Sequence, residues 1–177
     1  KFINYIYSGS GEKFYLNNYK SQYKSRVKKI YLPKLKFLNN VIKEKKQILE
    51  IGSGAGHFLK ACEIKKIYAK GYESNKDLVK LGNQELSFNK IELMNLDKTY
   101  DQILNSKSNT LVLISVLEHL ENPHLVLKNF VKSKIKYLYI SVPLFSLSSI
   151  IENSFKSIFP RQLAADHTHL FTKESIN

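Results

Sequence analysis

Apolar and polar positions alternate along the chain in a pattern that predicts strands followed by helices. Short apolar runs predict strands over 47–51, 66–73, 91–95, 110–115 and 135–142. Between them, apolar residues recur every three or four positions, which predicts helices over 57–64, 76–88 and 97–107 and another after Asn122. That last helix is expected to bury Val126, Leu127, Phe130 and Val131. Such alternation predicts an α/β fold with a parallel sheet in the order 3-2-1-4-5 and helices on both faces.

The first 44 residues read differently from the rest. Residues 1–20 are aromatic and polar and are expected to form an arm, whereas 21–42 repeat apolar residues with helical spacing. Pro33 divides that stretch into two helices, because proline is tolerated only in the first turn. We therefore expect two units, an N-terminal arm with helices over 1–44 and a sheet domain over 45–177.

A glycine-rich turn joins the first predicted strand to the helix that follows. Gly52 and Gly54 allow a sharp turn and a close approach of ligand to backbone. A dinucleotide fingerprint would need its third glycine at the position of His57, but Gly56 comes one residue earlier. The pattern acid-x-Gly-x-Gly-x-Gly, which begins at Glu50, resembles the S-adenosylmethionine loop of Rossmann-like methyltransferases. A tight turn without a ligand is the alternative.

The resemblance implies a Rossmann-like fold with S-adenosylmethionine at the carboxyl edge of the sheet. Glu73, at the end of the second strand, would accept hydrogen bonds from ribose hydroxyls, unless it is a surface residue. Either Asn95 or Asp97 would contact the adenine amino group beside Leu96, and Asp97 could instead cap a helix. The expected cofactor contacts are Glu50, Gly52, Ser53, Gly54, Gly56, Glu73, Ser74, Asn95, Leu96, Asp97, Ser115 and Leu117. A complete sheet of this family would add two strands after a helix near Thr172, and we expect them to be missing here.

The segment after the fourth strand reads Val-Leu-Glu-His-Leu, then Asn122-Pro123. It resembles small-molecule O-methyltransferases related to ubiquinone-biosynthesis enzymes. His119 is the candidate general base, because its pKa lies near neutrality, and Glu118 is expected to act with it. Both could instead hold the next helix. The segment 140–172 resembles the substrate side of methyltransferase-domain proteins found with bacterial surface-polysaccharide enzymes, so we expect a small-molecule or glycan hydroxyl as acceptor.

A rival interpretation involves a metal and RNA. Small-RNA 3′-end methyltransferases hold a divalent metal with a Glu-x-x-Glu-His motif and a later histidine. Ser115 replaces the first Glu here, so Glu118, His119 and either His167 or His169 would form an incomplete set. We expect no metal. A non-catalytic nucleotide-binding module is a further alternative.

Two more groups of residues are candidates for ligand contacts. Arg161, His167 and His169 would face the acceptor, and Tyr19, Tyr23 and Arg26 would fold over the carboxylate of the cofactor.

Charge and composition narrow the partners. The chain has 177 residues and a net charge of +13, but its basic residues are mostly lysines spread along the sequence. Arginine is preferred for specific base and phosphate contacts, so nucleic acid is the less favoured partner. An anionic small molecule or a membrane surface fits the charge equally well. Cys62 is the single cysteine, which excludes an internal disulfide and is expected to be buried. No apolar run approaches the roughly 18 residues of a membrane span, and no signal peptide is visible, so a cytoplasmic location is expected.

Overall fold

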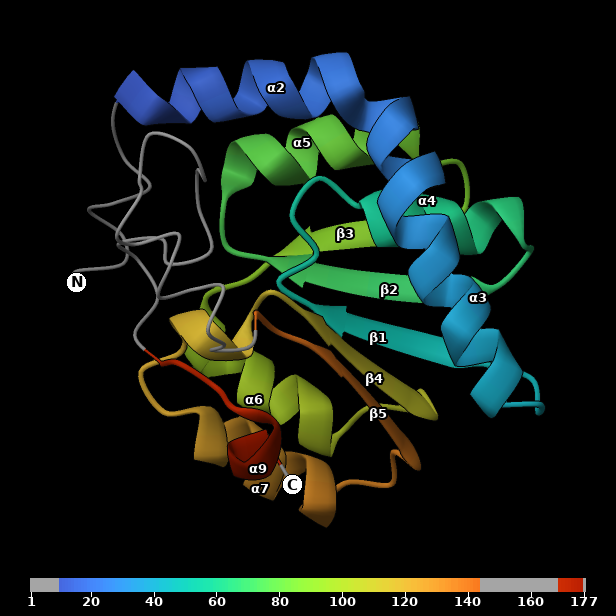
Figure 1. Cartoon of the computed structure of the whole chain (residues 1–177), viewed down its shortest axis with the longest axis vertical. Helices are drawn as coiled ribbons and strands as arrows, with labels where there is room; N and C mark the ends of the chain where they lie inside the picture. The colour runs from blue at the N-terminus through green and yellow to red at the C-terminus, as the bar shows by residue number, and fades with distance from the viewer. Residues whose placement is uncertain (1–9, 144–168, 177) are drawn as a thin grey trace.

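The computed structural model describes residues 10–143 and 169–176, and its centre is a five-stranded parallel sheet (Figure 1). The strand order β3-β2-β1-β4-β5 confirms the order predicted from the sequence. The strands are β1 (Gln47–Ile51), β2 (Tyr68–Glu73), β3 (Lys90–Leu93), β4 (Thr110–Ile114) and β5 (Tyr137–Ser141). The helical elements are α2 (Ser10–Arg26), η1 (Val27–Tyr31), α3 (Leu32–Val41), α4 (His57–Ile64), α5 (Lys76–Glu85), α6 (Leu96–Leu104), η2 (Leu117–His119), α7 (Pro123–Lys132) and α9 (Lys173–Ile176).

Helices cover both faces of the sheet. The N-terminal helices, α4 and α5 lie on one face, and α6, α7 and α9 lie on the other (Figure 1). Successive strand residues point to opposite faces, so Ile48 joins the first apolar cluster and Leu49 the second. All five residues of β4 are buried, as expected of a central parallel strand. None of the helices within 10–143 and 169–176 is long and apolar enough to cross a bilayer.

The N-terminal region corrects one expectation. Residues 10–20, predicted to lie in an arm, form the first part of α2. Pro33 lies in the first turn of α3, as predicted, but the turn before it is the π-helical η1. In an α-helix, side chains four residues apart differ in direction by about 40°, because one turn takes 3.6 residues. The wider turn of a π-helix compensates for this difference. Tyr23, Val27 and Leu35, whose successive spacings are four and eight residues, can therefore face the same core.

A second correction concerns α7. Val126 is buried as predicted, but Val131 is 79% exposed and Asn129 is turned inward at 9% exposed. The predicted apolar stripe was one residue too wide at its C-terminal end, where the helix leaves the core.

Glu63, near the end of α4, ties that helix to the turn before β3. Its Oε1 accepts backbone N–H bonds from Ser87 at 2.7 Å, Phe88 at 2.8 Å and Asn89 at 2.9 Å. Its Oε2 accepts a bond from Lys60 Nζ at 3.0 Å. Burial alone would raise the pKa of Glu63, but these hydrogen bonds outweigh burial and lower it.

Replacing Glu63 should therefore destabilise the fold. Glu63→Ala leaves three backbone N–H groups without their acceptor, and we expect a loss of about 3 kcal/mol in urea unfolding. Because the folded pKa is depressed, this stabilisation exists above the unfolded pKa, near 4.3, and is lost as the pH falls through the folded pKa. Glu92→Ala is the matched control, since Glu92 forms an exposed pair with Lys70 and should cost at most about 1 kcal/mol. Equal losses in the two variants would contradict the assigned role of Glu63.

Candidate functional site

The glycine-rich turn after β1 has one side open to a ligand. Gly52, Gly54 and Gly56 have φ angles of 69°, 54° and 73°, a left-handed region that other residues enter at a cost. A Cβ on Gly52 would lie 2.5 Å from Val116, and one on Gly56 would lie 2.8 Å from Ile91. At Gly54 no heavy atom of the described residues lies within 4 Å of that position. Packing therefore requires glycine at the outer two positions, and Gly54 marks the open side of the turn.

Glu73 holds this open side in place from the end of β2. Its Oε2 accepts the N–H of Gly54 at 2.8 Å. Its Oε1 accepts the N–H groups of Ser74 at 2.8 Å and Asn75 at 2.9 Å, and the exposed Ser74 hydroxyl at 3.4 Å. A carboxylate has about four acceptor positions. Glu73 thus joins the glycine turn to the turn after β2, in the place where the sequence predicts a ribose contact.

Glu50 is a buried acid with an oxygen that has no partner. It is 2% exposed, and its Oε2 lacks a hydrogen-bond partner among the described residues. Burial, followed by the charge of Glu73, raises the pKa of Glu50 well above its usual range. Buried unsatisfied polar atoms are uncommon and call for an explanation. A bound donor or cation beside β1 would supply one.

Three tyrosine rings surround His57, the first residue of α4. The ring centroids of Tyr19, Tyr23 and Tyr31 lie 5.3, 4.4 and 5.3 Å from the imidazole. His57 is 2% exposed. Burial and then the charge of Arg26 lower the pKa of His57 to about 3, so it is neutral at physiological pH. The imidazole serves here as a packed ring that anchors the N-terminal helices to the glycine turn.

Tyr23 and Arg26 are engaged by the protein itself. The Tyr23 hydroxyl donates to the Gly56 carbonyl at 3.3 Å, and the guanidinium of Arg26 lies 4.9 Å from the Tyr19 ring centroid. The sequence led us to expect these side chains over the carboxylate of the cofactor, but Tyr23 is instead used to hold the turn. Sequence reasoning missed the central role of His57, for which the four-residue spacing of the tyrosines was the available signal.

The turn after β4 carries the predicted catalytic residues. Ser115 is exposed and has φ 54°, a left-handed conformation that is strained for serine, and its N–H donates to Ser141 O at 2.8 Å. Leu117 and Glu118 are 2% and 1% exposed, so their side chains face the interior. His119, at the end of η2, is half-buried. Of these residues, Ser115 and His119 are the ones with side chains accessible at the surface.

The remaining expected cofactor contacts differ in whether their side chains face the surface. The Ser53 hydroxyl turns toward the sheet and lies 3.4 Å from Tyr72 O, so Ser53 would meet a ligand through its backbone. Asn95 is exposed at the start of α6 and makes no side-chain cap bond. Leu96 and Asp97 form the first residues of that helix.

The metal set of the rival interpretation lies only partly within the described residues. Within 10–143 and 169–176, no group of three metal-binding side chains gathers. The backbone N–H of His169 donates to Glu118 O at 3.2 Å, which places the C-terminal segment beside η2. His167 and Arg161 lie outside the described residues.

The predicted positions share one location. Glu50 and the glycine turn, Glu73, Asn95 and Ser115 lie at or follow the carboxyl ends of β1, β2, β3 and β4. In a parallel sheet these ends form one edge, where α/β proteins bind ligands. The open backbone at Gly54, the anchored carboxylate of Glu73 and the unpartnered oxygen of Glu50 suit a nucleoside with polar groups at both ends.

Comparisons with known proteins identify the family. Residues 23–177 match the family described as "Methyltransferase domain". No curated protein matches the sequence. A solved SAM-dependent methyltransferase from Archaeoglobus fulgidus aligns with a TM-score of 0.62 and 23% identity, over 82% of this chain and 63% of that one.

Two further solved structures share the fold. Magnesium protoporphyrin IX methyltransferase from Synechocystis, with bound S-adenosylhomocysteine, has a TM-score of 0.59 and 13% identity, over 92% of this chain and 69% of that one. A TehB-like methyltransferase from Corynebacterium glutamicum has a TM-score of 0.59 and 13% identity, over 81% of this chain and 83% of that one. At such identities the likeness shows the fold alone. Because the family match covers most of the sequence, the chain belongs to the methyltransferase-domain family, whose Rossmann-like members use S-adenosylmethionine as methyl donor.

Proposed function

We propose that the protein methylates a hydroxyl group of a small molecule or glycan with S-adenosylmethionine as donor, in the manner of the ubiquinone-biosynthesis-type O-methyltransferases. The observation that carries the proposal is the open side of the glycine turn at Gly54, held 2.8 Å from the Glu73 carboxylate. The chain spans 63% of the length of the Archaeoglobus methyltransferase, so the activity of the whole protein is part of this proposal.

The residues around the turn suit each part of the donor. A ribose hydroxyl would take the place of the Ser74 hydroxyl, whose 3.4 Å bond to Glu73 is the longest that this carboxylate accepts. The exposed Asn95 side chain is our candidate for the contact with the adenine amino group, through its amide oxygen. The free oxygen of Glu50 would accept from the amino-acid end. When bound, the cofactor supplies an activated methyl group on its sulfonium.

The protein's own contribution is alignment and proton removal. The acceptor hydroxyl must lie in line with the bond that breaks, and such positioning accounts for much of the rate. His119, on the turn after β4, is the residue we assign to take the proton of that hydroxyl. Glu118 is 1% exposed, so we assign it to support of this turn and not to contact with the acceptor.

The acceptor class rests on the sequence. The Val-Leu-Glu-His-Leu segment and the polar segment 140–172 support a glycan or small-molecule hydroxyl, and a role in bacterial surface-polysaccharide synthesis is the most specific form of the proposal. The structural relatives include a possible histamine N-methyltransferase from Thermotoga maritima and a magnesium protoporphyrin IX methyltransferase, so the shared fold does not select the acceptor class.

Calorimetry tests the donor site first. S-adenosylhomocysteine should bind with one site per chain, and NAD should not bind. Binding of NAD, or of neither ligand, would remove the basis of the proposal. A third titration, with single-stranded RNA at two salt concentrations, tests the nucleic-acid alternative. That alternative requires RNA binding whose affinity falls steeply as the salt concentration rises.

A further inference from the structure

Lys34 reaches from α3 across to the end of β5. Its Nζ donates to Ser141 Oγ at 2.6 Å, and the side chain is half-buried. A hydroxyl carries no charge to offset an ammonium. In the described ion pairs, by contrast, Lys60, Lys70 and Lys136 each reach a carboxylate.

The described surroundings of Lys34 contain no counter-charge. Burial lowers the pKa of Lys34. Among the described residues, no Asp or Glu lies within ion-pair distance of its Nζ. Withdrawing an ammonium from water without a paired anion is unfavourable, and a bound oxyanion would reverse that.

The Lys34–Ser141 pair lies next to the proposed reaction site. Ser141 is the last residue of β5, and its carbonyl accepts the N–H of Ser115 at 2.8 Å. Ser115 begins the turn that leads to His119. The pair is therefore at the same carboxyl edge of the sheet as the glycine turn, one strand beyond β4.

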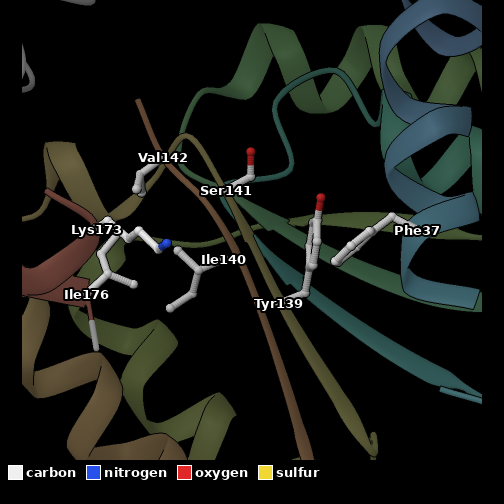
Figure 2. A pocket seen from close by; sticks show the side chains of 7 residues that line it. All are labelled: Phe37, Tyr139, Ile140, Ser141, Val142, Lys173 and Ile176. Carbon is white, nitrogen blue, oxygen red and sulfur yellow. The ribbon is translucent and has the colours of Figure 1, made fainter. Parts of the chain in front are cut away.

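An aromatic hollow continues from Ser141 along the outer edge of β5. It has a volume of about 430 Å³ and is lined in part by Phe37, Tyr139 and Ser141. The Phe37 and Tyr139 rings face each other with centroids 6.2 Å apart, and the Tyr139 and Ser141 hydroxyls point to the same side of the strand (Figure 2). The hollow thus offers an apolar wall, the hydroxyl groups of Tyr139 and Ser141, and the basic side chain of Lys173.

We propose that Lys34 and Ser141 bind an oxyanion, a phosphate or a carboxylate, carried by the methyl acceptor. The apolar part of the acceptor would pack against Phe37 and Tyr139, and its hydroxyl would extend past Ser115 toward His119. That the bound anion belongs to the methyl acceptor rests on the proposed function. The anion site itself rests on the Lys34–Ser141 geometry. It narrows the acceptor class to anionic molecules, which agrees with the net charge of +13.

Titration of the ¹⁵N-labelled protein tests the site. Inorganic phosphate and acetate are added in separate arms at constant ionic strength, and the amide resonance of Ser141 is followed. At least one of the two anions should give a saturable shift of this resonance. The anion with the higher affinity identifies the group as a phosphate or a carboxylate. Lys34→Met should weaken that binding about tenfold or more, Lys34→Arg should retain it, and Ser141→Ala should weaken it several-fold.

Lys36→Met is the matched control, because Lys36 is an exposed lysine on the same helix and should leave the titration unchanged. Equal affinities in the Lys34→Met and Lys36→Met proteins, or no saturable shift in either arm, would overturn the anion site. S-adenosylhomocysteine affinity, measured on the same samples, should be the same in all variants. If that ligand fails to bind the parent protein while the phosphate or acetate result holds, the proposed function fails and the anion site remains.

Discussion

Gly54→Val is expected to weaken S-adenosylhomocysteine binding by at least about a hundredfold. Two effects add at this position. The new side chain would project into the open space at the turn, where we place the donor and where no atom of residues 10–143 or 169–176 lies within 4 Å. Valine is also strained at φ 54°, because β-branched residues avoid the left-handed region. Calorimetry on the purified variant, with circular dichroism to show that it is folded, measures the loss.

Lys66→Val separates these two effects. Lys66 is exposed, with φ 56°, in the turn between α4 and β2, at the opposite end of α4 from the glycine turn. Valine there carries comparable backbone strain without approaching the proposed ligand. This control should melt at a lower temperature than the parent and bind S-adenosylhomocysteine equally well. Undiminished affinity in Gly54→Val would show that the donor does not occupy the turn.

His119→Ala should lower turnover by about 10²–10⁴-fold, the range expected when a general base is lost. The affinity for S-adenosylhomocysteine should stay within about twofold of the parent value, because we assign His119 to the acceptor and not to the donor. The variant should also change the pH dependence of turnover, because the side chain that we assign to take the proton is gone. The assay uses the full-length protein with its acceptor.

His124→Ala is the corresponding control. His124 is exposed in the first turn of α7, five residues from His119, and we assign it no role. It should keep parental turnover and the same pH profile. If His119→Ala also retains parental turnover, His119 has no part in proton removal, and the turn after β4 only shapes the site.

Local patterns explain why most of the fold was predictable. The Asn75 side chain accepts the N–H groups of Asp77 and Leu78, and Pro123 follows Asn122, so α5 and α7 begin where their residues allow capping. The strand order followed from alternation and right-handed crossovers. The errors arose where packing overrides local preference, as in residues 10–20, which are helical because α2 packs against α5.

The candidate site was less predictable than the fold. The spacing of the glycines and the acid at position 73 identified the turn, because such spacing reflects backbone geometry. The sequence does not show which side chains of a turn are buried. It therefore could not show that the side chains of Glu118, Leu117 and Ser53 face inward. The division at residue 44 and the individual ligand contacts stay predictions.

The sequence by itself determined that this chain forms a parallel α/β sheet with a glycine-rich turn after its first strand, since short-range spacing sets both. Only the tertiary structure decided that His57 is a neutral packed ring between three tyrosines, and that Lys34 meets Ser141 from 107 residues away. The reason is physical. Contacts between distant segments depend on which helix covers which strand, and the charge state of a buried group depends on everything packed around it.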